Sequence, residues 1–168
     1  MKNIVLTGFM ATGKTTIGTL LAKKLGRRFI DTDALIAEHE QKTIPEIFLE
    51  NGEKYFRQIE SEIIAEVSKL SNCIISTGGG AVLNKKNIDN LRKNGVIVNL
   101  NASPQIIAER TNQDNKRPLL EKKTKEQIEK MLTERALYYA DNDFSIDVDN
   151  LSPIIIADQI ISMYKRLI

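Results

Sequence analysis

The chain has 168 residues, a length that predicts a single domain spanning residues 1–168. Its 24 Lys and Arg residues nearly balance its 22 Asp and Glu residues, which argues against a nucleic-acid coat protein and a polybasic membrane binder. The single cysteine, Cys73, excludes an internal disulfide framework and any zinc site with two thiolates. No apolar run approaches the roughly 20 residues that span a bilayer. We therefore expect a cytoplasmic protein that binds neither nucleic acid nor membranes.

Short runs rich in β-branched residues alternate with longer segments along the chain. This alternation predicts βαβ units and a parallel sheet whose strands are buried on both faces. The predicted strands contain residues 4–6, 29–30, 74–75, 96–98 and 144–146.

The intervening segments carry readable helix signals. Apolar residues recur at helical spacing after Thr16 as far as Gly26, a residue that favours a helix end. Thr124 and Gln127 have the spacing of a capping box, and Pro153 suits the first turn of a last helix. The polar stretch 111–117 separates two helical patterns and is predicted to be a loop that orders on demand.

Residues 8–15, GFMATGKT, fit the phosphate-loop pattern G-x-x-x-x-G-K-[ST] and lie between a predicted strand and an amphipathic helix. In such a loop, backbone amides and the helix N-terminus surround the phosphates of a nucleotide. Lys14 would reach the β- and γ-phosphates, and the Thr15 hydroxyl would bind Mg²⁺. The N-K-x-D signature of guanine-specific proteins is absent, so we expect an adenine nucleotide.

Three charged residues lie on helix faces that should be apolar. Glu60 falls on the apolar stripe of a helix over residues 56–67, and Arg57 lies at the edge of that stripe. Arg135 falls seven residues after Ile128 on another apolar face. An ionised side chain in a core needs a partner or a ligand. Each charge alone is consistent with a structural ion pair or with a tilted helix. Together with a phosphate loop, they favour an anion-binding site.

Two further motifs follow predicted strands, at the sheet edge where ligands bind in open α/β folds. Asp31 and Asp33 come directly after the second strand, so one could support Mg²⁺ and the other could hold or deprotonate an acceptor hydroxyl. Helix capping is the alternative for either residue. Residues 78–80 are three consecutive glycines, which indicates close approach of a ligand.

Arg117 lies at the end of the polar loop. An arginine on a mobile lid that meets the γ-phosphate is a recurring device in phosphoryl transfer. A solvated loop charge is the alternative interpretation.

Taken in order, these motifs resemble the shikimate kinase family, over residues 8–153. The resemblance implies a three-layer α/β P-loop kinase fold: a five-stranded parallel sheet flanked by helices, with a substrate-binding region (33–62) and a mobile lid (111–124). It also implies transfer of the γ-phosphoryl of ATP to the 3-hydroxyl of shikimate with Mg²⁺, on the route to chorismate and the aromatic amino acids.

The resemblance further implies a role for each motif residue. The implied catalytic residues are Lys14, Asp33 and Arg117, and the implied metal ligands are Thr15 and Asp31. The implied nucleotide-binding residues are Ala11, Thr12, Gly13, Lys14, Thr15, Thr16, Arg110, Arg117 and Pro153, with Arg110 and Pro153 on either side of adenine. The implied shikimate-binding residues are Asp33, Arg57, Gly78, Gly79, Gly80 and Arg135, with an apolar wall of Phe48, Phe56, Pro118 and Leu119.

One residue departs from the family pattern, which usually has glycine where this chain has Ala11. We expect its methyl group to be tolerated if φ is negative. The rival functions are another small-molecule kinase, such as a gluconate or nucleoside-monophosphate kinase, and an ATP-hydrolysing module that drives partner binding. We expect a monomer, because no long apolar surface stripe is left unexplained.

Overall fold

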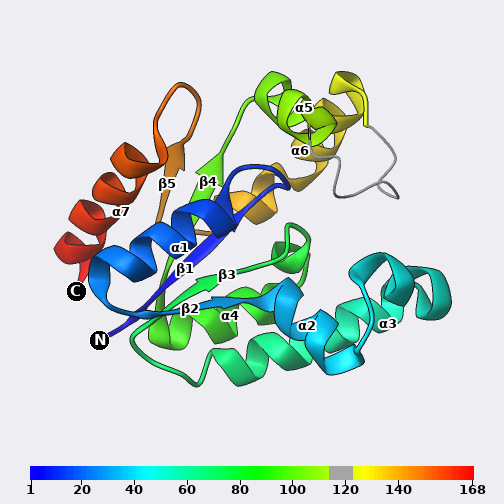
Figure 1. Ribbon diagram of the computed structural model, residues 1–168, viewed down its shortest axis with the longest axis horizontal. Helices are drawn as coiled ribbons and strands as arrows, with labels where there is room; N and C mark the ends of the chain where they lie inside the picture. Colours follow the sequence, from blue (N-terminus) through cyan, green and yellow to red (C-terminus); the bar gives the residue numbers. More distant parts are fainter. Residues whose placement is uncertain (114–122) are drawn as a thin grey trace.

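The computed structural model describes residues 1–113 and 123–168, which form one parallel sheet covered by helices on both faces (Figure 1). The described strands follow the order β2-β3-β1-β4-β5, and all neighbouring pairs run parallel. The strands are β1 (Asn3–Gly8), β2 (Arg28–Asp31), β3 (Cys73–Ser76), β4 (Gly95–Asn101) and β5 (Phe144–Asp147). Each contains one of the predicted runs, so the predicted α/β fold class is confirmed.

Helices connect the strands and pack against the sheet. They are α1 (Lys14–Leu25), α2 (Thr32–Glu40), α3 (Ile44–Val67), α4 (Lys85–Asn94), α5 (Pro104–Gln113), α6 (Lys125–Ala140) and α7 (Pro153–Leu167), with a short 3₁₀ turn η1 (Ala81–Leu83). Among the described residues, none of these helices combines the length and apolar character needed to cross a membrane.

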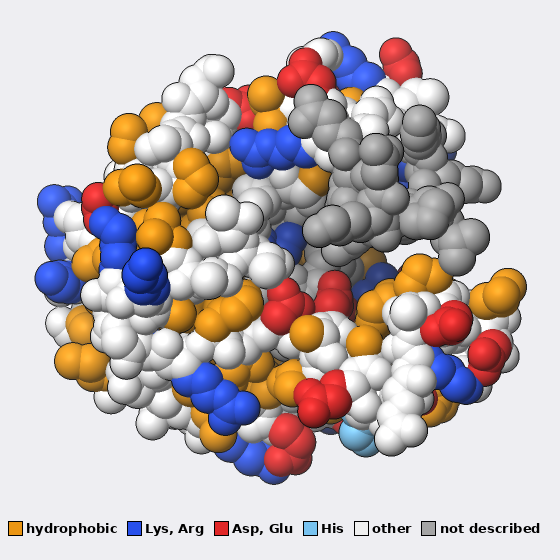
Figure 2. Space-filling view, viewed as in Figure 1, with side chains coloured by type: hydrophobic (Ala, Val, Ile, Leu, Met, Phe, Trp, Pro, Cys, Tyr) orange, Lys and Arg blue, Asp and Glu red, His pale blue; other side chains and the backbone are white. Residues whose placement is uncertain are grey.

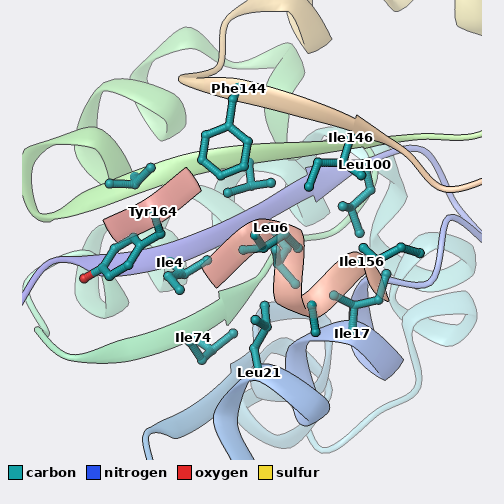
Figure 3. Packing of buried hydrophobic residues seen from close by; sticks show 14 of the residues in the cluster. Ile4, Leu6, Ile17, Leu21, Ile74, Leu100, Phe144, Ile146, Ile156 and Tyr164 are labelled. Carbon is teal, nitrogen blue, oxygen red and sulfur yellow. The ribbon is translucent and has the colours of Figure 1, made fainter. Parts of the chain in front are cut away.

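The core lies in two layers, one on each face of the sheet. Ile4 and Leu6 of β1 face α1 and α7, as Figure 3 shows, and Val5 between them belongs to the opposite layer under α3 and α4. Because side chains alternate along a strand, a continuous apolar run supplies both layers at once. A smaller apolar cluster, which includes Ile36, Ile47 and Phe56, joins α2 to α3 beside the sheet.

Two local features differ from the sequence expectations. Helix α5 continues through Gln113, so residues 111–113 form its last turn rather than the start of a loop, and residues 114–122 lie outside the described part of the chain. Helix α3 starts at Ile44, well before the predicted residue 56, with a capping box between Thr43 and Glu46. Its two halves meet at Gly52, whose φ of 80° breaks the helical path.

Helix α1 packs closely against strand β2 at Gly18 and Phe29. A Cβ on Gly18 would overlap the ring of Phe29, with Cδ2 only 3.1 Å away. Gly18 lies one turn after Thr15, and Phe29 lies two residues before Asp31. The glycine therefore lets the helix approach the strand closely enough to place Thr15 beside Asp31.

We expect Gly18→Ala to lower the free energy of unfolding by about 1–3 kcal/mol, because the added methyl overpacks this contact. Urea denaturation measures the change, and Ser162→Ala on the exposed face of α7 is the matched control. Helix propensity alone would make both substitutions stabilising. A gain in stability for Gly18→Ala would contradict the packing role.

Candidate active site

The phosphate loop connects β1 to α1 and curves between them. Gly8 and Gly13 have φ values of 140° and 94°, which favour glycine. The Lys14 ammonium donates to the carbonyl oxygens of Gly8 and Phe9, both at 2.8 Å, and the Thr12 hydroxyl donates to Phe9 O at 2.9 Å. These bonds restrain the loop from inside and place Lys14 across its mouth.

Ala11 has a φ of 60°, so the condition under which its methyl group was expected to be tolerated, a negative φ, is not met. The loop must reverse its path here before α1 begins, and the left-handed conformation achieves this. For a residue with a Cβ, that conformation costs roughly 1–2 kcal/mol. The Ala11 carbonyl accepts a hydrogen bond from Arg110 Nη1 of α5 at 3.1 Å, which supports the strained position from outside.

Asp31 serves two neighbours with its two carboxylate oxygens. Oδ1 caps α2 by accepting from the backbone amides of Asp33 and Ala34, at 3.0 and 3.3 Å. Oδ2 accepts the Thr15 hydroxyl at 3.0 Å. Helix capping and a place beside Thr15 are therefore compatible, although the sequence presented them as alternatives.

A hydroxyl and a carboxylate side by side are hard oxygen donors, which suit Mg²⁺. No group of three or more His, Cys, Asp or Glu side chains that could hold a metal occurs among residues 1–113 and 123–168. A small protein donor set also fits Mg²⁺, which usually retains several waters and takes phosphate oxygens as further ligands.

The triple-glycine turn (Gly78, Gly79 and Gly80) follows β3 and is surrounded by charged and backbone groups. A Cβ on Gly78 would lie 2.6 Å from Asp33 Oδ1 and 3.0 Å from Glu60 Oε1. A Cβ on Gly80 would overlap the Arg57 guanidinium, and one on Gly79 would lie 3.3 Å from the Met10 amide nitrogen. The three glycines therefore leave room for Asp33, Glu60, Arg57 and the phosphate loop to lie close together around the turn.

Arg57 and Glu60 of α3 form an ion pair, with Nη1 and Oε2 2.8 Å apart. The Glu60 side chain is only 1% exposed, and its Oε1 has no hydrogen-bond partner within the described part of the chain. Burial raises the pKa of Glu60, whereas the charge and hydrogen bond of Arg57 oppose the rise. Arg57 is 28% exposed, so the structural ion pair leaves its guanidinium accessible to an anion.

Arg135 and Tyr139 come from α6. The Arg135 guanidinium lies 5.7 Å from the ring centroid of Phe9 in the phosphate loop. Tyr139, one turn later, donates a 2.6 Å hydrogen bond to Gly79 O. Sequence reasoning missed Tyr139, although its spacing of four residues from Arg135 places both on one helix face.

The other predicted site residues fall in three places. Phe48 and Phe56 of α3 contact each other with ring centroids 4.5 Å apart. Thr16 is exposed in the first turn of α1, and Pro153 is exposed at the start of α7. Arg117, Pro118 and Leu119 lie outside the described residues. The face of the molecule that is turned toward the viewer in Figure 2 has a hollow near its centre, with both acidic and basic side chains around it.

The family model for shikimate kinase matches residues 10–165. A shikimate kinase from Caldicellulosiruptor saccharolyticus is 50% identical over 165 residues, which cover 98% of this chain and 96% of the relative. Another, from Thermoanaerobacter pseudethanolicus, is 44% identical and covers 99% of this chain and 98% of the relative.

Solved structures give the same result. A shikimate kinase from Acinetobacter baumannii in complex with shikimate superposes with a TM-score of 0.92 at 32% identity, covering 99% of this chain and 94% of that one. A gluconokinase from Sinorhizobium meliloti, with a TM-score of 0.60 and 17% identity over 99% of this chain and 93% of that one, shares the fold alone. The chain belongs to the shikimate kinase family.

Proposed function

We infer that this chain transfers the γ-phosphoryl of ATP to the 3-hydroxyl of shikimate, giving shikimate 3-phosphate and ADP on the route to chorismate and the aromatic amino acids. One observation carries this inference beyond the family likeness. The triple-glycine turn brings the carboxylate of Asp33, the guanidinium of Arg57 and the phosphate loop together around one small turn. A carboxylate for hydroxyls and a guanidinium for an acid match a hydroxylated carboxylic acid.

On the nucleotide side, we propose that residues 11–16 bind the phosphates of ATP. Backbone amides in a loop of this kind and the N-terminus of α1 favour negative charge. The Lys14 ammonium would exchange its hydrogen bonds to the Gly8 and Phe9 carbonyls for charge-assisted hydrogen bonds to phosphate oxygens. Its charge would therefore have hydrogen-bond partners both before and after the exchange. Arg110 and Pro153 would enclose the adenine, and the Ala11 contact brings Arg110 to the loop.

Thr15 and Asp31 are the proposed ligands of Mg²⁺, either directly or through water. When bound, the ion would neutralise charge on the β- and γ-phosphates. A hydrogen bond joins the two side chains, which keeps their oxygen atoms close together.

On the acceptor side, we propose that Arg57 and Arg135 bind the shikimate carboxylate, with Gly79 and Gly80 alongside. Guanidinium groups bind carboxylates through paired, charge-assisted hydrogen bonds. Phe48 and Phe56 would contact the apolar ring face, joined by Pro118 and Leu119. These assignments make residues 33–62 the substrate-binding region.

Asp33 is the proposed acceptor of the proton that leaves the 3-hydroxyl as its oxygen attacks the γ-phosphorus. The electron pair of the bond to the leaving oxygen stays on ADP, and the transferred group carries the negative charge that Lys14 stabilises. We propose Arg117, in a lid over residues 111–124, as a second cation at the transferred phosphate. Such a lid would also keep water from the reacting groups.

Three further expectations complete the proposal. We propose that the enzyme works as a monomer, in the cytoplasm, and without nucleic acid or membrane partners. The near balance of acidic and basic residues supports the lack of nucleic-acid and membrane partners, and the single cysteine supports the cytoplasm.

The direct test is ADP release measured with shikimate, gluconate or AMP as the acceptor. We expect ADP release that depends on shikimate and on Mg²⁺, with little stimulation by the other two compounds. Stimulation by gluconate would favour the alternative small-molecule kinase, and ADP release that ignores all three acceptors would favour an ATP-hydrolysing module.

Asp33→Asn should lower kcat by about 10²–10⁴-fold, because a neutral amide cannot take the hydroxyl proton. Steady-state assays with saturating shikimate and ATP measure this change. Asp89→Asn, on the exposed face of α4, is the control and should leave kcat unaltered. An unchanged kcat in Asp33→Asn would exclude Asp33 as the base.

Arg135→Ala should raise the KM for shikimate by about 10–100-fold, because one charge-assisted partner of the carboxylate is lost. The KM for ATP should change far less. Arg92→Ala is the matched control, since Arg92 is also half-buried but binds Asp141 away from the phosphate loop. Equal increases in both KM values would contradict the assignment of Arg135 to shikimate.

A further inference from the structure

Tyr139 is a buried tyrosine that takes no part in the chemical steps of the proposed reaction. Its side chain belongs to the core layer under α6, the residue is 8% exposed, and its hydroxyl donates to Gly79 O at 2.6 Å. We propose that Tyr139 is a positioning residue, which fixes the triple-glycine turn in the geometry that binds shikimate. This proposal rests on the proposed function and assigns a further residue to the same site.

The turn needs restraint because three consecutive glycines have unusual backbone freedom. Its outer carbonyls are held within the chain segment itself: Gly78 O accepts from the Ala81 amide and Gly80 O from the Leu83 amide, both at 3.1 Å. The middle carbonyl, that of Gly79, is bound by a side chain from α6, far away in sequence. Tyr139 therefore supplies the restraint that the local turn does not give itself.

Disorder in the triple-glycine turn would disturb the residues that are proposed to bind shikimate. Gly78 lies against Asp33 Oδ1, and Gly80 lies against the guanidinium of Arg57. A shift of the Gly79 peptide would move the surfaces against which both side chains rest. The effect would act through position, since the Tyr139 hydroxyl is already occupied by the Gly79 carbonyl.

Helix α6 also carries Arg135, so one helix face supplies an anion-binding group and the support of the turn. Burial raises the pKa of Tyr139, and the Arg135 and Arg57 guanidiniums oppose this rise. Both arginines proposed for the shikimate carboxylate thus act electrostatically on the Tyr139 hydroxyl. A well-fixed hydroxyl would keep the turn, Arg57 and Arg135 in one arrangement.

The phosphate loop has independent restraints. Lys14 and Thr12 hold the carbonyls of Gly8 and Phe9 without help from the turn. Loss of the Tyr139 hydroxyl should therefore affect shikimate much more than ATP. A purely structural tyrosine would show no such preference.

Tyr164 provides a matched control within the same chain. It is 2% exposed, and its hydroxyl also donates a 2.6 Å hydrogen bond to a backbone carbonyl, that of Lys2. Arg27 lies over its ring, with Cζ 4.9 Å from the centroid, and its Nη1 donates to the Tyr164 hydroxyl at 3.2 Å. The contact joins α7 to the N-terminus of β1, at the end of the sheet opposite to the phosphate loop.

The experiment compares the wild type, Tyr139→Phe and Tyr164→Phe by steady-state kinetics and thermal unfolding. Both variants should lose thermal stability, because each loses a buried hydrogen bond from a tyrosine hydroxyl to a backbone carbonyl, and Tyr164→Phe also loses the bond that its hydroxyl accepts from Arg27. Tyr139→Phe should also raise the KM for shikimate about tenfold, with kcat and the KM for ATP within about twofold of wild type. Tyr164→Phe should leave all three kinetic values unchanged.

An unchanged KM for shikimate in Tyr139→Phe would overturn the proposal, and so would equal increases in the two KM values. If Tyr139→Phe were too unstable to assay at the chosen temperature, its affinity for shikimate would be measured by calorimetry at a lower temperature. An affinity equal to that of the wild type would then overturn the proposal. Absence of shikimate-dependent ADP release in the wild type would identify failure of the proposed function instead, and this inference would fall with it.

Discussion

The close approach of charged groups to the triple-glycine turn is the constraint on which the site depends. A Cβ on Gly78 would run into the carboxylates of Asp33 and Glu60, and a Cβ on Gly80 would overlap the guanidinium of Arg57. Any side chain at these positions would displace one of those groups. Because Gly79 also rests against the Met10 amide, the same turn sets the separation between the acceptor groups and the phosphate loop.

Burial of charge follows from this arrangement. Glu60 is almost fully buried and pairs with Arg57, so the ion pair is partly desolvated and its loss would leave a charge in the core. The pair holds the guanidinium in place while one side remains open. On the nucleotide side, the Thr15–Asp31 hydrogen bond joins α1 to β2 in a similar way. Gly18 makes this bond possible because it lets α1 approach Phe29 closely. Contacts within the protein thus hold both the Arg57 guanidinium and the Thr15–Asp31 pair in place.

Sequence reasoning succeeded where the signal is local. Each buried strand is a short apolar run, and the phosphate loop is one uninterrupted motif, so the sheet and the loop could be predicted directly. The charged residues on apolar stripes correctly identified Glu60 as a buried carboxylate with Arg57 beside it. The capping box at Thr124 and the helix start at Pro153 were also correct.

The remaining features depend on contacts between distant segments. The positive φ of Ala11 is imposed by the path from β1 to α1 and supported by Arg110, 99 residues later. The two-sided role of Asp31 required knowing that α2 begins immediately after β2. Tyr139 could not be singled out from the sequence, because the carbonyl that it binds belongs to a turn 60 residues earlier.

The most direct test of this account is shikimate binding to Gly80→Ala, measured by isothermal titration calorimetry with MgADP as the internal reference. Gly80 has φ −93° and ψ −3°, which alanine adopts readily, so the new methyl would act on the Arg57 guanidinium rather than on the backbone. We expect shikimate affinity to fall by about tenfold or more while MgADP affinity stays unchanged. Wild-type shikimate affinity in Gly80→Ala would contradict the claim that the missing side chains let the acceptor groups converge.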